Sequence, residues 1–531
     1  MKKMKKMKKI LSLVLIMVIT LGITACSGKK DSDGGNKDGE LEHMEISIAC
    51  FDIANHVTHA ETDVVLQYVE EKFNITIEPV NITRANFRDQ LTLWASSNKL
   101  PDIMAGDASD TKQFAELARD GVIAAIPQEK IDKYPNLKEY LSDEAARTRM
   151  VDGEFYGIYR SSTSEIAKTS ANNQILYRWD LAQAAGVTEE PTTWDEFRDM
   201  IKKVQAVNPG MTGLTASSLD AMARRFMTYG VPEANIGGLA AKWVDNGDGK
   251  IVPAYLAGKK LGDSALPVFE LAREMYEEKT IDPDIAVIKK DEAIAKFVNN
   301  QAVALAVNDV PSLWGGMLKK WEKTHGASIA DSLKLLNPLP AADGETYIWA
   351  TTTGWSENYI SSNVSEEKME RILMLYDWLL TDEGFKVTYY GFEGETYSMT
   401  EDGPVYTETA LIDNPSINFW VQFIRWSTGF ERPEGFSNPR LDMPSVYEFL
   451  DDLEEKFPTM PRQKGFNADL NTEATNAFKL LESEFATDPE GDFVKIMTGS
   501  EKPSKMWKDI LKEYEKSGVN KVIDDVTDAC K

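Results

Sequence analysis

The chain has 531 residues, of which 42% are hydrophobic and 10% aromatic, which suits a globular protein too long for a single hydrophobic core. Its 85 Asp and Glu residues outnumber its 59 Lys and Arg residues, so the formal net charge is −26. A chain this acidic is not expected to bind nucleic acid, because affinity for a phosphate backbone depends on basic contacts.

The N-terminus begins with a lysine-rich stretch and continues with apolar residues 10–22, a run too short to cross a bilayer comfortably. Thr24 and Ala25 then precede Cys26, and this pattern resembles the signal of bacterial lipoproteins. The resemblance implies a signal peptide over residues 1–25, a diacylglycerol group on the Cys26 thiol and a flexible polar tether over residues 26–44. An ordinary secretory signal with a chance cysteine is the alternative.

The first hundred residues after the tether alternate between strand and helix patterns. Short β-branched or apolar runs predict strands, and apolar residues at helical spacing between them predict helices. The predicted strands cover residues 45–51, 75–80 and a stretch beginning at 101, and the predicted helices cover 64–73, 87–94 and 114–118. This βαβα pattern predicts an α/β fold with mostly parallel sheets flanked by helices.

A second alternation follows residue 160. Residues 174–177 predict a strand and residues 179–186 a helix that ends at a glycine. Thr193 and Glu196 have the spacing of a capping box and predict a helix start. Farther along, residues 302–307 predict a buried strand, residues 366–380 predict an amphipathic helix, and the last hundred residues are rich in helix patterns.

Several short motifs, each explained locally as a turn, a cap or a helix stop, together resemble extracellular solute-binding proteins of the maltose-binding-like class, the receptors of carbohydrate ABC importers. They lie at residues 99–103, 152–157, 191–197, 297–304 and 378–384. Residues 391–397, 493–499 and 514–518 resemble the larger lipoprotein branch typical of Gram-positive bacteria. Asn299 and Asn300 depart from the family pattern, which often has a glycine there.

The resemblance implies a two-lobed fold of the periplasmic-binding-protein type, with a ligand cleft at the hinge between the lobes. Lobe 1 would comprise residues 45–160 with 353–394, and lobe 2 would comprise 161–352 with 395–531. The chain would cross between the lobes after about Arg160, near Thr352 and near Gly394. Closure of the hinge would trap the ligand for a permease.

Candidate ligand-binding residues are polar or aromatic side chains expected at strand ends, crossovers or irregular stretches. A sugar site needs aromatic rings for C–H faces and planar polar groups for hydroxyls, and ligands of open α/β sheets bind beyond the carboxyl ends of strands. The candidates are Asp52, Asp107, Tyr159, Arg160, Trp314, Trp355, Glu393, Trp420, Arg425 and Trp426. Each has a structural alternative, such as a helix cap for the aspartates or a place in the core for the tryptophans.

Metal and catalytic patterns are weak. His56 and His59 lie near Glu61 without a fitting further ligand, and residues 245–250 predict a hairpin turn rather than a calcium loop. Beside Cys26 the chain has only Cys50 and Cys530, so no disulfide scaffold is expected. Neither a nucleophile elbow nor a P-loop is present, and we expect no cofactor, no metal and no enzymatic activity.

The sequence therefore predicts a monomeric, lipid-anchored receptor on the extracellular face of the cytoplasmic membrane that binds an oligosaccharide and delivers it to an ABC permease. Three alternatives remain: a tethered glycoside hydrolase, a peptide or amino-acid receptor of similar architecture, and a surface interaction protein. Turnover would identify the first, a response to peptides the second, and the lack of a closable cleft the third.

Overall fold

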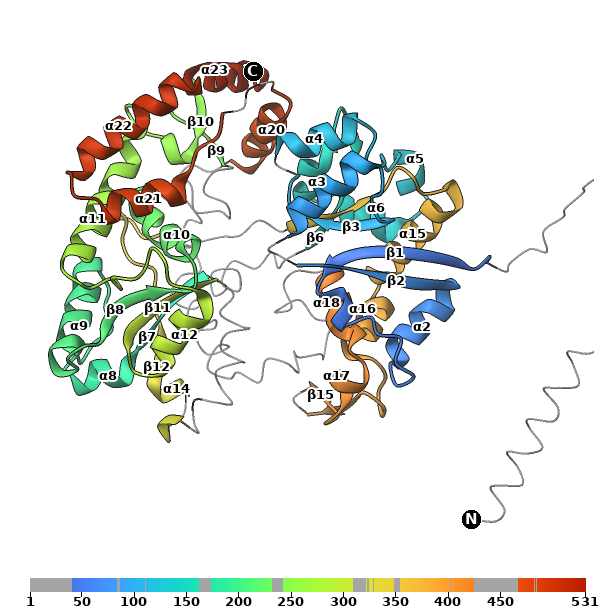
Figure 1. Ribbon diagram of the computed structural model, residues 1–531, viewed down its shortest axis with the longest axis horizontal. Helices are drawn as coiled ribbons and strands as arrows, with labels where there is room; N and C mark the ends of the chain where they lie inside the picture. The colour runs from blue at the N-terminus through green and yellow to red at the C-terminus, as the bar shows by residue number, and fades with distance from the viewer. Residues whose placement is uncertain are drawn as a thin grey trace, which may run out of the picture. The chain divides into compact units, whose positions relative to one another are not determined.

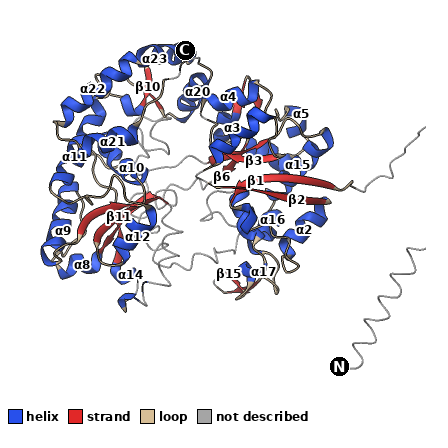
Figure 2. Ribbon diagram, viewed as in Figure 1, coloured by secondary structure: helices blue, strands red, loops and turns tan. Residues whose placement is uncertain are grey.

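The computed structural model describes residues 41–531 except 84–85, 110, 162–172, 232–241, 309–320, 322–323, 328, 348–353, 402, 425–466, 482 and 484. His43–Lys531 form one compact unit, in which a five-stranded and a four-stranded β-sheet each have their own hydrophobic core; three two-stranded sheets accompany them in the part of the chain that the structure describes (Figures 1 and 2). We call the parts built on the two larger sheets lobe 1 and lobe 2. Within the described ranges, no helix is both long and apolar enough to cross a membrane.

The sheet of lobe 1 has five strands in the order β2-β1-β3-β13-β6. They are β1 (Met44–Phe51), β2 (Ile75–Ile82), β3 (Ile103–Gly106), β6 (Ile158–Ser161) and β13 (Gly354–Ile360). Strand β1 pairs in parallel with β2 and β3, as the βαβ pattern predicts. Strand β13 enters from far along the sequence and runs antiparallel to both β3 and β6.

Helices cover this sheet, and side-chain caps fix where several of them begin. Asp63, which is fully buried, accepts a hydrogen bond from the backbone N–H of Leu66 at the start of α2, and Ser365 caps α15 in the same way. The remaining elements of lobe 1 are η1 (Ile53–Asn55), α2 (Val64–Phe73), α3 (Phe87–Ser97), α4 (Lys112–Arg119), α5 (Gln128–Ile131), α6 (Pro135–Leu141), η2 (Glu144–Arg149), β4 (Met150–Val151), β5 (Glu154–Phe155), α15 (Glu366–Leu379), α16 (Asp382–Tyr390), β14 (Tyr397–Thr400), β15 (Gly403–Tyr406), α17 (Ala410–Asp413) and α18 (Ser416–Phe423).

The sheet of lobe 2 has the order β12-β7-β11-β8. Its strands are β7 (Asn173–Arg178), β8 (Thr212–Ala216), β11 (Ala302–Asn308) and β12 (Leu333–Leu335). Only β8 and β11 pair in parallel, whereas β7 is antiparallel to both β11 and β12. The fold class is confirmed as α/β, but this sheet is mixed rather than mostly parallel. Strand β7 follows a segment that comes from lobe 1, so it does not belong to a βαβ unit that would fix its direction.

Helix α9 of lobe 2 begins at the predicted capping motif. Thr193 Oγ1 accepts from the N–H of Glu196, while Glu196 reaches back to Thr192 rather than to Thr193. The other elements are α8 (Trp179–Ala184), α9 (Trp194–Val207), α10 (Leu219–Gly230), β9 (Trp243–Asp245), β10 (Ile251–Pro253), η4 (Ala254–Leu256), η5 (Asp263–Ala265), α11 (Leu266–Glu277), α12 (Lys290–Val298), α14 (Ile329–Ser332), α20 (Ala468–Lys479), α21 (Pro489–Thr498), α22 (Pro503–Lys516) and α23 (Val519–Ala529).

The two cores show which segments belong together. The core of lobe 1 joins side chains of β1, β2 and β3 to those of α15 and α18, and the core of lobe 2 joins α9, α10 and α11 to α21, α22 and α23. Strands β6 and β13 thus belong to the sheet of lobe 1, and β7 and β12 to the sheet of lobe 2. The crossings near Arg160 and Thr352 stay predictions. The predicted third crossing near Gly394 is too early, because Ile417 and Phe423 are buried in the core of lobe 1.

Candidate functional site

Four strand ends meet at one edge of the lobe 1 sheet. Strands β1, β3 and β6 all run in the same direction, and β13, which lies between β3 and β6, runs in the opposite direction. The carboxyl ends of β1, β3 and β6 therefore share an edge with the beginning of β13. Ile48 pairs with Ile103, and continuing this register brings Asp52 level with Asp107. This edge is where ligands of open α/β sheets bind.

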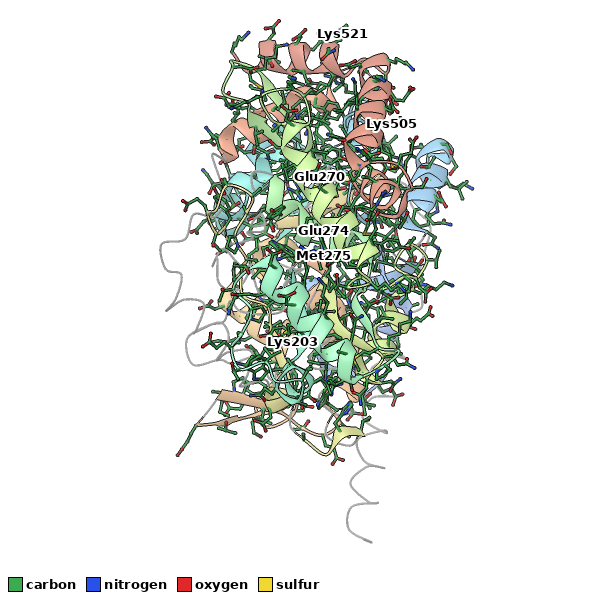
Figure 3. The ribbon with its side chains drawn as sticks, turned by 90° about the vertical axis from the view of Figure 1, so that its left-hand side faces the viewer. Lys203, Glu270, Glu274, Met275, Lys505 and Lys521 are labelled. Carbon is green, nitrogen blue, oxygen red and sulfur yellow. The ribbon has the colours of Figure 1, made fainter. Side chains whose placement is uncertain are left out.

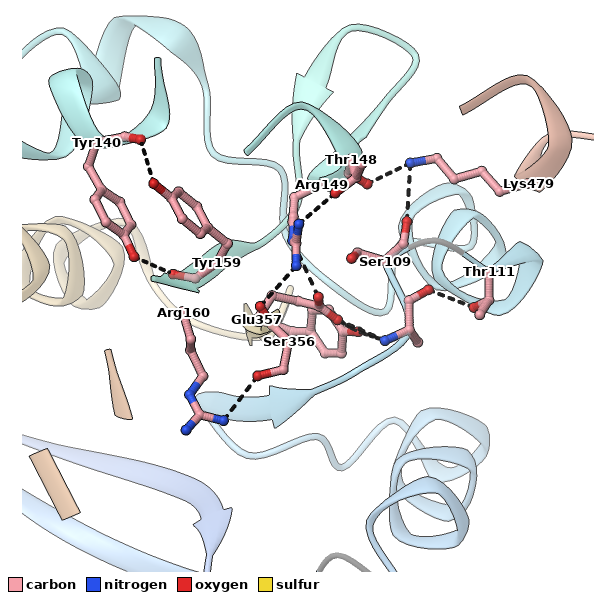
Figure 4. Close-up of polar contacts among 12 residues, drawn as sticks. Ser109, Thr111, Tyr140, Thr148, Arg149, Tyr159, Arg160, Ser356, Glu357 and Lys479 are labelled. Atoms are coloured by element: carbon pink, nitrogen blue, oxygen red, sulfur yellow. Dashed lines mark hydrogen bonds and ion pairs between the residues drawn. The ribbon is translucent and has the colours of Figure 1, made fainter. Parts of the chain in front are cut away.

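A buried carboxylate, Glu357, organises the chain at this edge (Figure 4). The residue is fully buried, and its Oε1 accepts hydrogen bonds from the backbone N–H of Ala108 at 2.9 Å and from the hydroxyl of Tyr359. Its Oε2 faces Arg149 Nε at 3.4 Å. A charge this deeply buried requires such partners. Glu357 therefore ties β13 to the chain just beyond β3.

Tyr359 fits against β3 because residue 106 is glycine. A Cβ atom at Gly106 would lie 2.1 Å from Cε2 of the Tyr359 ring, so any larger residue would displace that ring. Burial and the adjacent Glu357 carboxylate raise the pKa of the Tyr359 hydroxyl well above its ordinary value. The hydroxyl therefore remains protonated and serves as a hydrogen-bond donor to Glu357.

Strand β13 has a bulge next to this carboxylate. Its register with β6 shifts between Gly354 and Glu357, and Ser356 has a φ of 56°, in the left-handed region. The Ser356 hydroxyl accepts a hydrogen bond from Arg160 Nη1 at 3.0 Å, and its carbonyl accepts one from Arg149 Nη2 at 3.1 Å. Two buried arginines thus hold the bulge in place.

Aromatic stacking supports the neighbouring strand. The rings of Tyr140 and Tyr159 are parallel, with centroids 4.2 Å apart, and each hydroxyl donates to the backbone carbonyl of the other residue. Burial raises the pKa of Tyr159, so its hydroxyl stays protonated. With Tyr159 3% exposed and Arg160 1% exposed, both residues shape the edge from within.

Lobe 2 has a second polar edge, at the carboxyl ends of β8 and β11. Asn308 Nδ2 donates to Asp220 Oδ2 at 2.9 Å, and Arg224 Nε contacts Asp220 Oδ1 at 2.6 Å. Ser218 caps α10 directly after β8. Desolvation of its carboxyl and the neighbouring Asp220 carboxylate raise the pKa of Glu490, although the residue as a whole is exposed. This cluster can offer both donors and acceptors to a polar ligand.

Sequence reasoning did not single out these lobe 2 residues. A signal was present, because Asn308 ends the apolar run 302–308, and Asp220 follows two serines after the short strand β8. Asn308 is thus the last residue of β11, and Asp220 lies in the first turn of α10, which follows β8. Arg149 and Glu357 were also missed, since nothing in the sequence links residues 208 positions apart.

The structure describes the side chains of six of the predicted candidate residues: four lie at the lobe 1 edge, and two lie away from it. Asp52 is exposed and Asp107 half-buried, and both lie at the lobe 1 edge with Tyr159 and Arg160. Trp420 is 1% exposed within the core of lobe 1, which leaves it no surface to offer a sugar ring. Glu393 is exposed in the turn after α16, where it pairs with Tyr397 rather than with the strand ends.

The remaining candidates lie partly or wholly outside the residues that the structure describes. Trp355 lies in β13, at the lobe 1 edge, but its side chain is outside the described residues. Trp314, Arg425, Trp426 and the lipidation candidate Cys26 also lie outside them. These assignments stay predictions.

Among the described residues, no group of three or more His, Cys, Asp or Glu side chains is placed to hold a metal ion. Residues 245–250, which resemble a calcium loop in sequence, form the turn between β9 and β10. There Asp245 Oδ1 accepts from the N–H of Gly247 at 2.8 Å, and Asp248 Oδ1 accepts from the N–H of Lys250 at 3.1 Å. His59 contacts Glu70 rather than Glu61.

A cavity of about 400 Å³ lies between α9 and α11 of lobe 2, on the face where Figure 3 labels Glu270 and Glu274. Arg198, which lines it, contacts Asp195 at 2.9 Å and both Glu274 and Glu278 at 2.7 Å. The arginine is thus committed to three carboxylates, and we interpret this region as a structural joint between the two helices.

Comparison with known proteins identifies the family of this two-lobed chain. The family model described as "Bacterial extracellular solute-binding protein" matches residues 65–394, a stretch that contains strands of both sheets. The chain belongs to the bacterial extracellular solute-binding proteins. The resemblance recognised in the sequence is confirmed at this level.

Relatives of this solute-binding protein include curated and structurally known carbohydrate-binding proteins. The polygalacturonan/rhamnogalacturonan-binding protein YtcQ of Bacillus subtilis (strain 168) is 22% identical over 399 residues, covering 73% of this chain and 74% of the relative. The alginate-binding protein AlgQ2 has a TM-score of 0.67 at 16% identity, covering 92% of this chain and 98% of that one. FusA of S. pneumoniae in complex with kestose has a TM-score of 0.62 at 17% identity, covering 92% and 99%. These structural matches confirm the fold.

Proposed function

We propose that this solute-binding protein captures an oligosaccharide outside the cell and delivers it to an ABC permease without chemical conversion. The observation that carries the proposal is the polar edge of lobe 1, at the carboxyl ends of β1, β3 and β6, in a chain of this family. The printed names of two curated relatives support a carbohydrate ligand. They are a polygalacturonan/rhamnogalacturonan-binding protein and a fructooligosaccharide ABC transporter substrate-binding protein.

Within the proposed site, Asp52 and Asp107 accept hydrogen bonds from sugar hydroxyls, because both carboxylates follow strand ends at the same edge. Arg160 contributes by holding the bulge at Ser356. In lobe 2, Asp220 and Asn308 supply polar groups from the opposite sheet. The aromatic surfaces are proposed to come from Trp314, Trp355 and Trp426, with Arg425 beside them.

The proposal includes attachment to the membrane through a lipid on Cys26. The support is the lysine-rich, apolar and small-residue pattern that precedes this cysteine, followed by a polar tether. Two or more acyl chains give stable anchoring. The protein is then held near its permease, works as a monomer and needs no transmembrane helix of its own.

A ligand screen tests the proposed function. Thermal unfolding is followed with oligogalacturonides, rhamnogalacturonan oligosaccharides, fructooligosaccharides and, as a different class, peptides. A saccharide at a hundred times its Kd should stabilise the native state by about 2.7 kcal/mol. Calorimetry then measures the affinity, and chromatography of the bound saccharide tests for turnover. A response to peptides alone would contradict the proposal, and released shorter sugars would favour a hydrolase.

A pair of variants locates the site once a ligand is known. Asp107→Asn should weaken saccharide binding by about tenfold, the effect of losing a charge-assisted hydrogen bond. The matched control is Asp132→Asn, because Asp132 is exposed and pairs with Lys138 on α6. Equal affinities for both variants would show that Asp107 does not contact the ligand.

A further inference from the structure

Helix α20 packs against β9 and α23 of lobe 2 on one side and against α4 and η2 of lobe 1 on the other. Ala474 is part of the lobe 2 core, and the Phe478 ring lies 5.3 Å from that of Trp243. The backbone N–H of Trp243 also donates to Asn471 Oδ1 at 3.0 Å. The apolar face of α20 is therefore fixed to the β9 strand of lobe 2.

The last residue of this helix, Lys479, reaches into lobe 1 (Figure 4). Its Nζ donates to the carbonyl of Thr148 at 2.8 Å and to the carbonyl of Ser109 at 3.3 Å. The side chain is 1% exposed, and Nζ lies 5.1 Å from the centroid of the Phe114 ring. These hydrogen bonds are strong, because the ammonium group is charged and buried, and water cannot take the place of the carbonyl oxygens as acceptors.

Both carbonyls belong to segments that build the lobe 1 edge. Ser109 lies two residues after Asp107, and the intervening Ala108 donates its N–H to Glu357 while its carbonyl accepts from Thr111 at 2.6 Å. Thr148 precedes Arg149, the ion-pair partner of Glu357. Lys479 therefore joins the two segments that Glu357 already connects from the side of β13.

Two other contacts accompany this one but are more exposed. Arg147 pairs with Asp469, whose side chain is 71% exposed, and Asn476 Nδ2 donates to the carbonyl of Arg147 at 3.3 Å. Exposed ion pairs stabilise little. Lys479 is the buried contact of the set.

We propose that Lys479 is a positioning residue of the saccharide site: acting from lobe 2, it fixes the segment after β3 that carries Asp107. This inference rests on the proposed function. The position of the Asp107 carboxylate then depends on the contact of α20 with lobe 1. The affinity for the sugar is therefore coupled to the contact between the lobes.

The test compares Lys479→Met, which keeps the aliphatic stem over Phe114 but removes the donors, with Lys479→Arg, which keeps a charged donor. The control is Lys505→Met on α22 (Figure 3), because Lys505 is 61% exposed and pairs only with Glu501 among the described residues. Amide hydrogen exchange in the full chain without ligand is the first measurement. We expect exchange of the Ala108 N–H and its neighbours to rise about tenfold in Lys479→Met, with β2 unchanged and largely restored protection in Lys479→Arg.

Saccharide affinity is the second measurement, using whichever oligosaccharide the ligand screen identifies. Lys479→Met should bind about tenfold more weakly, and Lys505→Met should bind as the parent protein does. Exchange at residues 107–109 that stays the same in Lys479→Met would overturn the inference. Increased exchange with unchanged affinity would overturn it too, because the segment would then move without consequence for the ligand.

The two proposals fail in different ways. If no saccharide binds the parent protein, the proposed function fails, while the exchange experiment still reports whether Lys479 holds the segment. Should Lys479→Met not fold, Lys479→Gln decides, since its shorter, uncharged side chain cannot reach both carbonyls as the ammonium group does. Raised exchange at Thr148 and Ser109 in that variant supports the inference, and unchanged exchange overturns it.

Discussion

Replacing Glu357 with glutamine should destabilise lobe 1 far more than the loss of one surface charge would. Glu357 and Arg149 expose only 1% and 7% of their side chains, so their charges compensate each other away from water. The amide of E357Q can still accept from Ala108 but directs a donor toward the Arg149 guanidinium. Removing one member of a buried pair costs about 3–5 kcal/mol. We expect about 3 kcal/mol, because Arg149 also donates to Thr148 and Ser356.

Urea unfolding followed by far-UV circular dichroism measures this change. The matched control is Glu501→Gln, since Glu501 pairs with Lys505 at 52% and 61% exposure and should change stability by less than about 0.5 kcal/mol. The double variant E357Q/R149M removes both charges and should recover at least about 1 kcal/mol relative to E357Q alone. A cost below about 1 kcal/mol for E357Q, or strictly additive effects in the double variant, would refute the argument that the charges are mutually compensating.

Three further results are expected. A hydrogen bond from Lys130 lowers the pKa of Glu370 to about 2, below its unfolded value of about 4.3. The stabilising effect of this carboxylate is therefore fully present above the unfolded value and is lost as the pH falls toward 2. Urea unfolding should show that Glu370→Gln costs most at pH 7, clearly less at pH 3 and little near pH 2. Trp420→Ala should lower the stability of the unliganded protein by about 3–5 kcal/mol in urea unfolding, since the ring fills the lobe 1 core. Cys26→Ser should release the protein from membranes, and a variant that still sediments with them after normal processing would contradict the lipid anchor.

Much of the fold could be predicted from sequence patterns that lie within single helices and strands. The period-2 runs at β1 and β2 and the helical spacing between them predicted parallel strands at the correct places, because each signal depends on residues within one element. The same reasoning placed Asp52 and Asp107 at the carboxyl edge of the sheet, since each follows a buried strand; their contact with a ligand stays a prediction.

Long-range pairings were beyond such reasoning. Glu357 and Tyr359 sit in a strand with three consecutive polar residues, 356–358, a pattern that gives no hint of a buried carboxylate. The partners of Glu357, Ala108 and Arg149, lie more than 200 positions away. Trp420 was misread for the opposite reason. Phe419, Trp420 and Phe423 have helical spacing and form one buried face of α18, but the stretch was interpreted as irregular.

The direction of β13 explains why these missed residues cluster. A strand that returned through a βαβ unit would run parallel to β3 and present its carboxyl end at the binding edge, whereas β13 runs antiparallel and presents its beginning. The segment arriving from lobe 2 therefore leads directly into the bulge at Ser356 and the buried Glu357. Lys479 contacts the same neighbourhood from α20, so strand β13 and helix α20 both reach the chain that carries Asp107. The ligand site proposed at the ends of β3 and β6 therefore lies beside both of these contacts.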